Sequence, residues 1–347
     1  MKYTLKQKIG AFLFDLPRFL WSIRPDWFFC RSTKPWIFMR NRNERLIIDK
    51  GKEGAQCDWQ WTSDLHAAKV FPFLGKVFMK RVFNDHPIAL KNDPDRPSGD
   101  IDVSFIIGHR GLKRLPNLLF VLKSIAAQIN VSLECIVVEQ SLNEEIKALL
   151  PGWVRYIHTP LPRPELLYCR SWAFNSGARR AKGRLLILHD NDLLIPADYA
   201  GELISKYNSG YEVINLKRFI FYFSQKHTER ILQKNNTLYV ESPERILQNL
   251  EGGGSVAVTK EAYFAIGGFD ESFVGWGGED NEFWERARTR KVWPYGYFPL
   301  IHLWHQFQAD ARFARGLGRY TAELFESRLK VAVEERIREL IFRNFGR

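Results

Sequence analysis

One stretch of the chain decides the fold, and it reads Leu185-Leu186-Ile187-Leu188-His189-Asp190-Asn191-Asp192. A run of large aliphatic residues bounded by polar turn formers predicts a short buried strand. The D-x-D that follows predicts a divalent-ion site, because hard cations prefer carboxylate oxygens and bridge them to the phosphates of a nucleotide. Asp and Asn are also common turn residues, so the motif alone is weak. Its place directly after an apolar strand is what favours the metal site.

Strands and helices alternate on the N-terminal side of this stretch. We expect strands at 101–107, 133–140, 153–158 and 185–189, and helices at 115–129, 143–150 and 170–181. Such alternation predicts an α/β fold with a mostly parallel, Rossmann-like sheet flanked by helices. Ligands of these sheets bind beyond the carboxyl ends of the strands. The rule brings Gly108–Arg110, Glu139–Gln140 and Asp190–Asp192 to one edge, where we expect a nucleotide-binding crevice.

A second informative stretch lies downstream and reads Gly267-Gly268-Phe269-Asp270-Glu271-Ser272-Phe273-Val274-Gly275-Trp276-Gly277-Gly278-Glu279-Asp280-Asn281-Glu282-Phe283-Trp284. Its glycines permit tight turns and close approach to a ligand. The carboxylates of Glu279, Asp280 and Glu282 favour a helix N-terminus, where the macrodipole is positive. A turn and a capped helix would explain this much. Trp276 between two glycines, directly before adjacent carboxylates, adds an aromatic platform beside a general base, which a sugar-binding site needs.

Two imidazoles follow at His302 and His305, three residues apart. A lone histidine is more often structural than a ligand. Either of these two is a candidate to complete the metal site of the D-x-D. Mixed oxygen and nitrogen ligands suit Mn²⁺ better than Mg²⁺, so Mn²⁺ is the expected ion and Mg²⁺ the alternative.

The formal net charge of +12 over 347 residues predicts an anionic partner, such as a nucleotide or phospholipid headgroups. No nucleic-acid-binding motif is visible, and we expect no nucleic acid. The scattered cysteines are typical of reduced thiols in a cytosolic protein; they are Cys30, Cys57, Cys135 and Cys169. No apolar run is long enough to cross a bilayer. The expected location is cytoplasmic, either free or peripheral at the inner face of the cell membrane.

Composition divides the chain into three regions. Residues 1–97 form a basic, aromatic-rich extension that either anchors in a membrane interface or packs on its own domain. A turn-rich linker at 91–100 leads into a catalytic domain over 98–306, in which 214–250 is expected to be an irregular, mobile or substrate-facing insertion. Residues 307–347 are expected to be an amphipathic helical segment that packs on the core, or on a membrane as the alternative. Its single apolar stripe would consist of Phe325, Leu329, Val333, Ile337, Ile341 and Phe345.

As an ordered set, these motifs resemble those of a known family. Asp190-Asn191-Asp192, the Gly-Gly-Phe-Asp segment and Gly275–Asp280 are similar to the metal-binding and acceptor-binding motifs of β-1,4-galactosyltransferases. Bacterial family 2 transferases and chondroitin polymerases carry similar motifs. The resemblance covers residues 101–306 and is far more specific than any one motif. It implies a GT-A fold, a nucleotide-diphospho-sugar donor and Mn²⁺.

The resemblance also implies a role for each matching residue on the donor side. Gly108, His109 and Arg110 match a Pro-Phe-Arg that touches the nucleotide, and only the arginine is kept. Arg170 and Asn175 match further donor-binding residues, and the strand-end rule adds Glu139 and Asp190. Asp192 and His305 match metal ligands, while His302 stands where the family has a methionine ligand. Trp276 matches the tryptophan of a mobile loop that closes over the donor.

On the acceptor side, Asp280 matches the general base that takes the proton of the acceptor hydroxyl. Glu279 is expected to orient the acceptor or the loop. Gly277, Gly278, Glu279 and Asn281 fall at acceptor-binding positions. Asn281 replaces an aspartate of the family, which leaves the identity of the acceptor open.

The implied reaction is a single inverting displacement from a UDP-sugar to a hydroxyl of a glycan or lipid-linked glycan. UDP-galactose is the default donor and UDP-N-acetylgalactosamine the alternative. Retention stays open because polypeptide N-acetylgalactosaminyltransferases carry a similar Trp-Gly-Gly-Glu segment, although Asp192 and Asp280 replace their His and Asn. A basic, non-catalytic scaffold on a transferase fold is the alternative of another class; the D-x-D, the histidines and the Glu-Asp pair argue against it.

Overall fold

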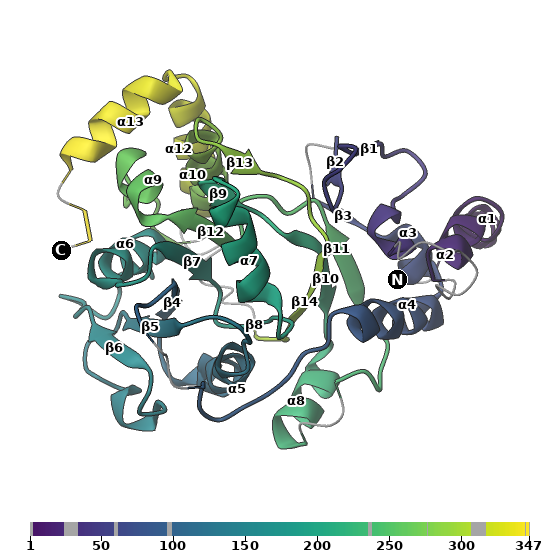
Figure 1. Cartoon of the computed structure of the whole chain (residues 1–347), viewed down its shortest axis with the longest axis horizontal. Coiled ribbons are helices and arrows are strands. Elements are labelled where there is room, and N and C mark those ends of the chain that lie inside the picture. Colours follow the sequence, from purple (N-terminus) through teal and green to yellow (C-terminus); the bar gives the residue numbers. More distant parts are fainter. Residues whose placement is uncertain are drawn as a thin grey trace.

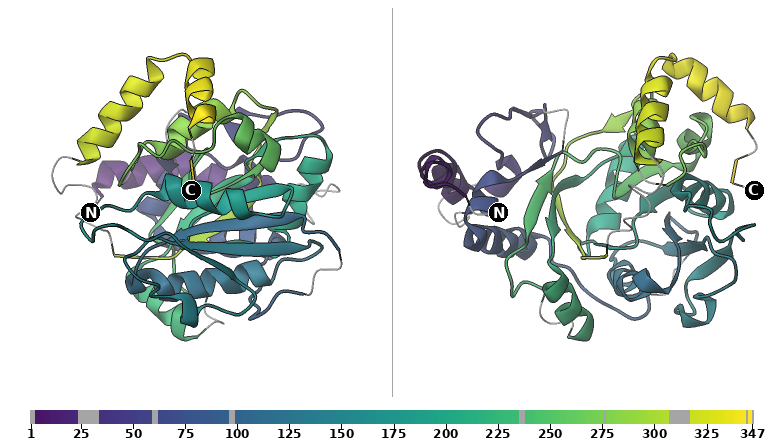
Figure 2. Two further views of the ribbon diagram at one scale, coloured as in Figure 1. Left: turned by 90° about the vertical axis from the view of Figure 1, so that its left-hand side faces the viewer. Right: turned by 180° about the vertical axis from the view of Figure 1, so that it is seen from behind.

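A computed structural model gives the arrangement of the chain (Figure 1). It describes residues 3–23, 34–58, 62–95, 99–234, 238–275, 277–306, 317–343 and 345–346. Cys30, Trp276 and residues 307–316 therefore lie outside the described residues. Two sheets occupy the middle of the molecule, with the N-terminal helices at one end and the last two helices at the other, as the views of Figures 1 and 2 agree.

Seven of the described strands form the larger sheet, in the order β13-β9-β12-β7-β4-β5-β6. β4 to β7 run parallel to one another, β12 runs antiparallel to both of its neighbours, and β9 and β13 are parallel. The bounds are β4 Val103–His109, β5 Leu133–Glu139, β6 Arg155–His158, β7 Leu185–His189, β9 Val213–Ile214, β12 Ser255–Thr259 and β13 Val292–Trp293. The predicted α/β fold with a mostly parallel sheet is confirmed.

Helices cover both faces of this sheet. Successive side chains of each strand point to opposite sides, and because they are apolar on both sides, both faces need a covering layer. Phe105 and Ile107 of β4 face one core, which includes residues of α5 (Leu115–Ala126) and α7 (Tyr199–Asn208). Ile106, between them, faces the other core, with residues of α6 (Arg170–Arg180), α9 (Lys260–Ala265) and α10 (Glu279–Ala287). Burial on both faces explains why these strands are continuous apolar runs in the sequence.

The second sheet shares the core of α5 and α7, and its described strands have the order β3-β11-β10-β14-β8. The bounds are β3 Ser63–Asp64, β8 Leu193–Leu194, β10 Lys217–Tyr222, β11 Arg245–Gln248 and β14 Phe298–His302. The expectation of an irregular insertion at 214–250 is wrong, since β10, α8 (Gln225–Gln233) and β11 are regular. β10 was not predicted because it begins with two basic residues, Lys217 and Arg218. Both are buried, and both donate hydrogen bonds to backbone carbonyls.

The N-terminal region packs on the second sheet. Trp36, Phe78 and Phe83 share a core with β10, and the ring centroids of Phe78 and Phe219 lie 5.2 Å apart. β3 extends the sheet by pairing with β11. The remaining elements are α1 Leu5–Gly10, η1 Ala11–Asp15, α2 Leu16–Ile23, η3 Pro35–Phe38, β1 Leu46–Ile47, β2 Gln56–Cys57, α3 His66–Val70 and α4 Pro72–Asp85. The described residues from 34 to 58 and from 62 to 85 are thus packed on the domain that follows them.

The C-terminal region consists of α12 (Leu317–Leu329) and α13 (Val333–Phe342), which pack over α9 and α10. The single apolar stripe predicted here is wrong, because the chain breaks its helix at residues 330–332. Leu329 and Ile341 of the stripe are exposed, whereas Arg336 and Leu340 are buried. None of the helices in the described part of the chain is long and apolar enough to cross a membrane.

Smaller differences from the sequence predictions have local causes. β4 does not stop at Gly108 but continues through His109. The helix expected at 143–150 reduces to one 3₁₀ turn, η5 Lys147–Leu149, and a similar turn, η4 Leu112–Arg114, precedes α5. Glu139 accepts the backbone N–H groups of Glu145 and Ile146, so the chain there is held by a side chain instead of by helical hydrogen bonds.

Candidate active site

The carboxyl ends of β7, β4 and β5 lie next to one another in the larger sheet. His109 at the end of β4 is paired with Glu139 at the end of β5, and Asp190 follows the last residue of β7. The three polar segments that the strand-end rule assigns to one edge therefore do meet there.

A cluster of one carboxylate and two imidazoles lies just beyond β7. Asp192 is 4% exposed, with His302 Nε2 3.7 Å from its Oδ1 and His305 Nε2 3.3 Å from its Oδ2. Possible ligand atoms of the three residues all lie within 4.8 Å of one another. Oδ1 of Asp192 has no hydrogen-bond partner among the described residues. A buried carboxylate whose two oxygens each face one imidazole nitrogen, with one oxygen lacking a hydrogen bond, fits a divalent cation such as Mn²⁺.

The second sheet positions these ligands. β8 and β14 pair antiparallel with His302 opposite Leu193, and the Leu303 N–H donates to the Asp192 carbonyl at 2.8 Å. The His302 ring stacks on Tyr222 of β10 with centroids 4.2 Å apart. Two strands far apart in the sequence thus bring Asp192 and the histidines together, in an orientation fixed by the backbone and by one aromatic contact.

The pKa shifts of Asp192 and His305 suit metal binding. Burial alone would raise the pKa of Asp192, but the nearby His302, Arg114 and His305 outweigh it, so the pKa lies below its usual value. Burial lowers the pKa of His305, which favours its neutral imidazole. An ionised carboxylate and a neutral imidazole are the forms that bind a metal ion.

Arg170 joins this edge of the sheet to α10. Its Nε and Nη2 donate to Asp190 Oδ1 at 2.9 and 2.7 Å. Its Nη1 donates to Asp280 Oδ1 and lies 3.7 Å from Glu279 Oε1. Arg170 is the first residue of α6, directly after β6 and its loop, so its side chain reaches across the strand ends. The guanidinium therefore connects the D-x-D with the predicted base.

Glu279 and Asp280 begin α10, as the sequence predicted for this carboxylate-rich stretch. The helix is preceded by Gly277 and Gly278 at φ values of 100° and 88°, where a side chain would be strained. Burial raises the pKa of both carboxyls, and the pKa of Glu279 rises to about 7, with Asp280 adding to the effect and Arg170 opposing it. A carboxylate with a raised pKa is a stronger base, which suits Asp280 to proton abstraction.

The Asp280 side chain rests on a glycine loop that Lys217 holds in place. A Cβ at Gly253 would lie 2.9 Å from Asp280 Oδ2, so a larger residue there would displace the Asp280 carboxylate. The Lys217 ammonium donates to the carbonyls of Glu251 and Ser255, on either side of the glycines. Burial lowers the pKa of Lys217 to about 7, although Asp280 and Asp190 act to raise it. Sequence reasoning missed Lys217 because it assigned residues 214–250 to an insertion.

The end of β4 is shaped by a close contact with Tyr168. A Cβ at Gly108 would lie 2.0 Å from the Tyr168 hydroxyl, which explains the glycine. The buried His109 ring faces inward, between the Gly111 carbonyl at 2.8 Å and the Asn191 amide at 3.0 Å, and burial lowers its pKa to about 4. Arg110 donates to the carbonyls of residues 164 and 166. Nucleotide contacts of these three residues stay predictions.

Two predicted donor-side residues have their polar atoms in internal contacts. Glu139 is buried and accepts hydrogen bonds from the backbone of Glu145 and Ile146 and from the Tyr156 hydroxyl. The Asn175 amide donates to the Phe269 carbonyl and to Glu271, and its oxygen accepts from Tyr263. Glu139 holds the loop after β5, and Asn175 holds the turn before α10; direct donor binding by either stays a prediction.

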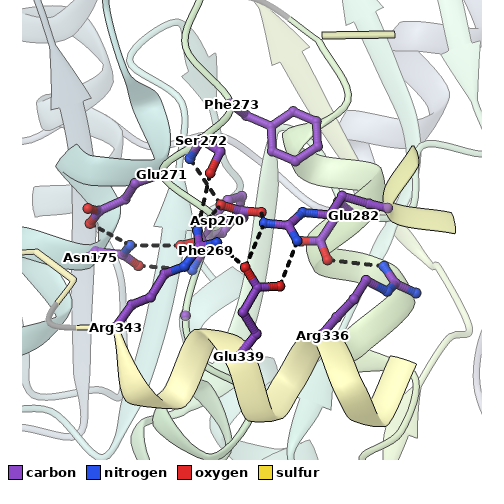
Figure 3. A network of polar contacts seen from close by, with 12 residues as sticks. Asn175, Phe269, Asp270, Glu271, Ser272, Phe273, Glu282, Arg336, Glu339 and Arg343 are labelled. Atoms are coloured by element: carbon purple, nitrogen blue, oxygen red, sulfur yellow. Dashed lines mark hydrogen bonds and ion pairs between the residues drawn. The ribbon is translucent and has the colours of Figure 1, made fainter. Parts of the chain in front are cut away.

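The turn and α10 are also tied to the C-terminal region (Figure 3). Arg336 of α13 donates to Glu282 at 3.0 Å, and Glu282 is also paired with Arg286 on its own helix. Arg343 donates to Asp270 at 3.1 Å, and Arg328 of α12 lies 2.7 Å from the same carboxylate. Together these ion pairs connect the last two helices to both ends of the segment that carries Glu279 and Asp280.

The remaining acceptor-side candidates differ in what the structure describes of them. Asn281 is exposed on α10 beside Asp280, so it is open to an acceptor. Gly278 lies against Phe273 and against Thr321 and Phe325 of α12. Trp276 lies outside the described residues, and its role as a lid stays a prediction. Arg114, 3.6 Å from Asp192 Oδ2, was missed, although its place just before a helix at the strand edge was a usable signal.

Two family models match the chain. Residues 112–266 match glycosyl transferase family 2, and residues 245–293 match a model described as the N-terminal domain of galactosyltransferase. The first region contains Arg170 and the D-x-D, and the second contains Glu279 and Asp280. No curated protein matches the chain significantly.

Solved structures of glycosyltransferases are also similar to the chain. The catalytic domain of Drosophila β-1,4-galactosyltransferase 7 in complex with xylobiose has 16% identity and a TM-score of 0.40, over 64% of this chain and 80% of that one. A point mutant of the same Drosophila enzyme, in complex with manganese, UDP-Gal and xylobiose, has 17% identity and a TM-score of 0.34, over 55% and 64%. TarS residues 1–349 of S. aureus have 11% identity and a TM-score of 0.44, over 69% of each chain.

The family matches confirm the resemblance that the motifs indicated. Over residues 112–266 the chain is similar to glycosyl transferase family 2, and the segment around α10 is similar to galactosyltransferases. The reaction that these similarities support is the transfer of a sugar from a nucleotide sugar.

Proposed function

We propose that this glycosyltransferase is an inverting, metal-dependent hexosyltransferase that uses a UDP-sugar. The donor is UDP-galactose or UDP-N-acetylgalactosamine, and the acceptor is a hydroxyl of a glycan or lipid-linked glycan. Asp192, His302 and His305 hold the metal ion, and Asp280 is the general base.

One observation carries the proposal: a metal-type cluster and a buried carboxylate pair meet at the same edge of the sheet. Asp190 and Asp192, two residues apart, face different partners. Asp192 faces the two histidines, while Asp190 is paired through Arg170 with Asp280. A donor whose diphosphate lies at the D-x-D would therefore present its sugar toward α10, where the base stands.

The chemistry of the residues supports this division of roles. A divalent ion held by Asp192, His302 and His305 would act as a Lewis acid for the departing diphosphate. Arg170 and Arg114 supply further positive charge where the diphosphate would lie. Asp280 takes the proton from the acceptor hydroxyl, whose oxygen attacks the anomeric carbon as the bond to the diphosphate breaks. Inversion needs this one base and no enzyme nucleophile, and Arg170 keeps the Asp280 carboxylate oriented.

The decisive experiment is a screen of nucleotide sugars for hydrolysis, with released UDP as the readout, in the presence of Mn²⁺, Mg²⁺ or a chelator. We expect turnover of a UDP-hexose that the chelator abolishes and Mn²⁺ restores. Asp280→Asn should lower transfer on the order of 10²–10⁴-fold. UDP binding with Mn²⁺, measured by calorimetry, should persist in this variant, because the amide still accepts a hydrogen bond from Arg170.

Three outcomes would contradict the proposal. A chain that neither binds UDP with Mn²⁺ nor hydrolyses any nucleotide sugar would exclude the transferase site. Loss of UDP binding in Asp280→Asn would refute the role of Asp280 as a base. A product whose anomeric configuration, read by NMR, equals that of the donor would show retention. Glu285→Gln is the matched control, since the Glu285 side chain is 42% exposed on the same helix and is paired only with Arg288 in the described residues.

A further inference from the structure

The first helical segment, residues 5–23, packs on the rest of the protein through a stripe of mostly small or polar residues. α1, η1 and α2 run continuously from Leu5 to Ile23, and the buried residues recur every three or four positions as Ala11, Asp15, Phe19 and Ser22. The Asp15 carboxylate lies 2.9 Å from His66 Nδ1 of α3. Only one of these four side chains is large and apolar, so this face is the less hydrophobic side of the segment.

Most of the large apolar side chains of the segment point outward. Leu5, Ile9, Phe12, Leu13, Phe14 and Leu20 are between 49% and 74% exposed. Leu5, Ile9 and Leu13 are four residues apart and so share one face. A helix of a globular protein normally turns its apolar stripe to the core. Contiguous exposed apolar surface of this kind marks an interaction site.

The charges around this surface have one sign. Lys6, Lys8 and Arg18 are exposed on the same segment, and the guanidinium of the exposed Arg42 lies 5.8 Å from the centroid of the Phe14 ring. The single carboxylate within residues 3–23, Asp15, is buried against His66. The apolar surface is therefore bordered by cations and by no exposed carboxylate of its own segment.

We propose that the outward face of α1, η1 and α2 docks on an anionic lipid bilayer. Large apolar residues between basic ones are the composition of helices that lie in a membrane interface. Anionic headgroups complement Lys6, Lys8, Arg18 and Arg42, whereas a second copy of the chain would bring the same cations and repel them. The segment lies along the surface and does not span the bilayer. This inference stands whether or not the proposed reaction is correct.

The test is flotation of the full chain with vesicles. We expect binding to vesicles of phosphatidylcholine mixed with phosphatidylglycerol, and weak binding to phosphatidylcholine alone. Phe12→Ser with Leu13→Ser should reduce the partition coefficient at least about tenfold, since two large side chains leave the bilayer. Lys6→Glu with Lys8→Glu should reduce binding to the anionic vesicles by roughly tenfold or more.

A matched control separates this face from general stickiness. Phe342→Ser with Leu149→Ser removes the same residue types from exposed positions elsewhere, at 87% and 52% exposure. The control should bind vesicles as the unchanged chain does, and all variants should keep their melting temperature. An equal loss in the control, or unchanged binding in Phe12→Ser with Leu13→Ser, overturns the proposal. A second result would also overturn it: light scattering shows a dimer that Phe12→Ser with Leu13→Ser dissociates, and the chain does not bind vesicles. The face would then join two copies.

Discussion

The buried carboxylate of Glu282 allows a direct test of how the C-terminal helix α13 is held to α10. The Glu282 side chain is 1% exposed and accepts hydrogen bonds from Arg286, at 2.6 to 3.1 Å, and from Arg336 of α13 at 3.0 Å. Both arginines are buried, at 0% and 4% exposure of the side chain. Glu282→Gln keeps the shape of the side chain and removes its charge. Two guanidiniums are then left in the interior with no carboxylate between them.

The size of the effect follows from this burial. Removing one partner of a buried ion pair costs about 3–5 kcal/mol, because the remaining charge stays desolvated. The glutamine oxygen still accepts one hydrogen bond, and Arg286 also donates to the Ile266 and Gly268 carbonyls. We therefore expect a loss of stability at the lower end of this range. At about 2.1 cal/mol/K of unfolding entropy per residue, a loss of about 3 kcal/mol corresponds to a fall in melting temperature of roughly 4–6 °C.

Thermal unfolding followed by circular dichroism measures this fall, and Glu285→Gln supplies the control. Glu285→Gln is the same chemical change, one helical turn after Glu282. The Glu285 side chain is, however, 42% exposed, and its partner Arg288 lies 3.8 Å away. An exposed pair contributes about 0–1 kcal/mol, so the control should melt within about 2 °C of the unchanged chain. Equal melting temperatures for the two variants would refute the reasoning that α13 is held to α10 by a buried charge.

Three further predictions concern the site itself. Burial and Asp280 raise the pKa of Glu279 from 4.5 to about 7, so the folded chain binds an extra proton and its stability should fall as pH rises from about 5 to 8; Glu279→Gln should reduce this slope in melting curves taken across that range, and the raised pKa of Asp280 leaves the remainder. Gly108→Ala should destabilise by about 1–3 kcal/mol in chemical unfolding, because its Cβ would lie 2.0 Å from the Tyr168 hydroxyl, and Tyr168→Ala in the same chain should restore part of the loss. Lys217→Met should lower kcat while UDP binding with Mn²⁺ persists, since the loop beneath Asp280 loses its ammonium and leaves carbonyl groups unsatisfied at about 1–3 kcal/mol; unchanged kcat would exclude a positioning role.

The larger sheet was predictable because its strands are buried on both faces. Runs such as Leu185–His189 are continuous and apolar, and the strand-end rule then places their polar neighbours on one edge. β10 was missed for the opposite reason: Lys217 and Arg218 open it, and a sequence does not show that carbonyl groups far along the chain will satisfy them. The division of residues 317–342 into two helices was missed because the apolar spacing continues across the break at 330–332.

Within the site, the sequence predicted which residues lie at the sheet edge better than it predicted what their side chains contact. The cluster of Asp192, His302 and His305 depends on β8 and β14, which pair over more than a hundred intervening residues, yet the D-x-D and the two histidines were sufficient to predict that these residues lie together. Glu139 shows the limit of the strand-end rule. It lies at the expected edge, but its carboxylate is taken up by the backbone of its own loop, and no spacing in the sequence distinguishes that from a carboxylate facing a ligand.

The ion pairs of Figure 3 also have a consequence for biosynthesis. Because a chain is made from its N-terminus, Asp270 and Glu282 are synthesised well before Arg328, Arg336 and Arg343, which neutralise them. The two sheets can therefore form on the nascent chain while Asp270 still lacks its arginine partners and Glu282 is paired with Arg286 but not yet with Arg336. Their burial, and with it the final position of Glu279 and Asp280, has to wait for the arginines. Nascent chains that stop short of α13 should fold their sheets and remain catalytically silent, so activity would appear only at the end of synthesis.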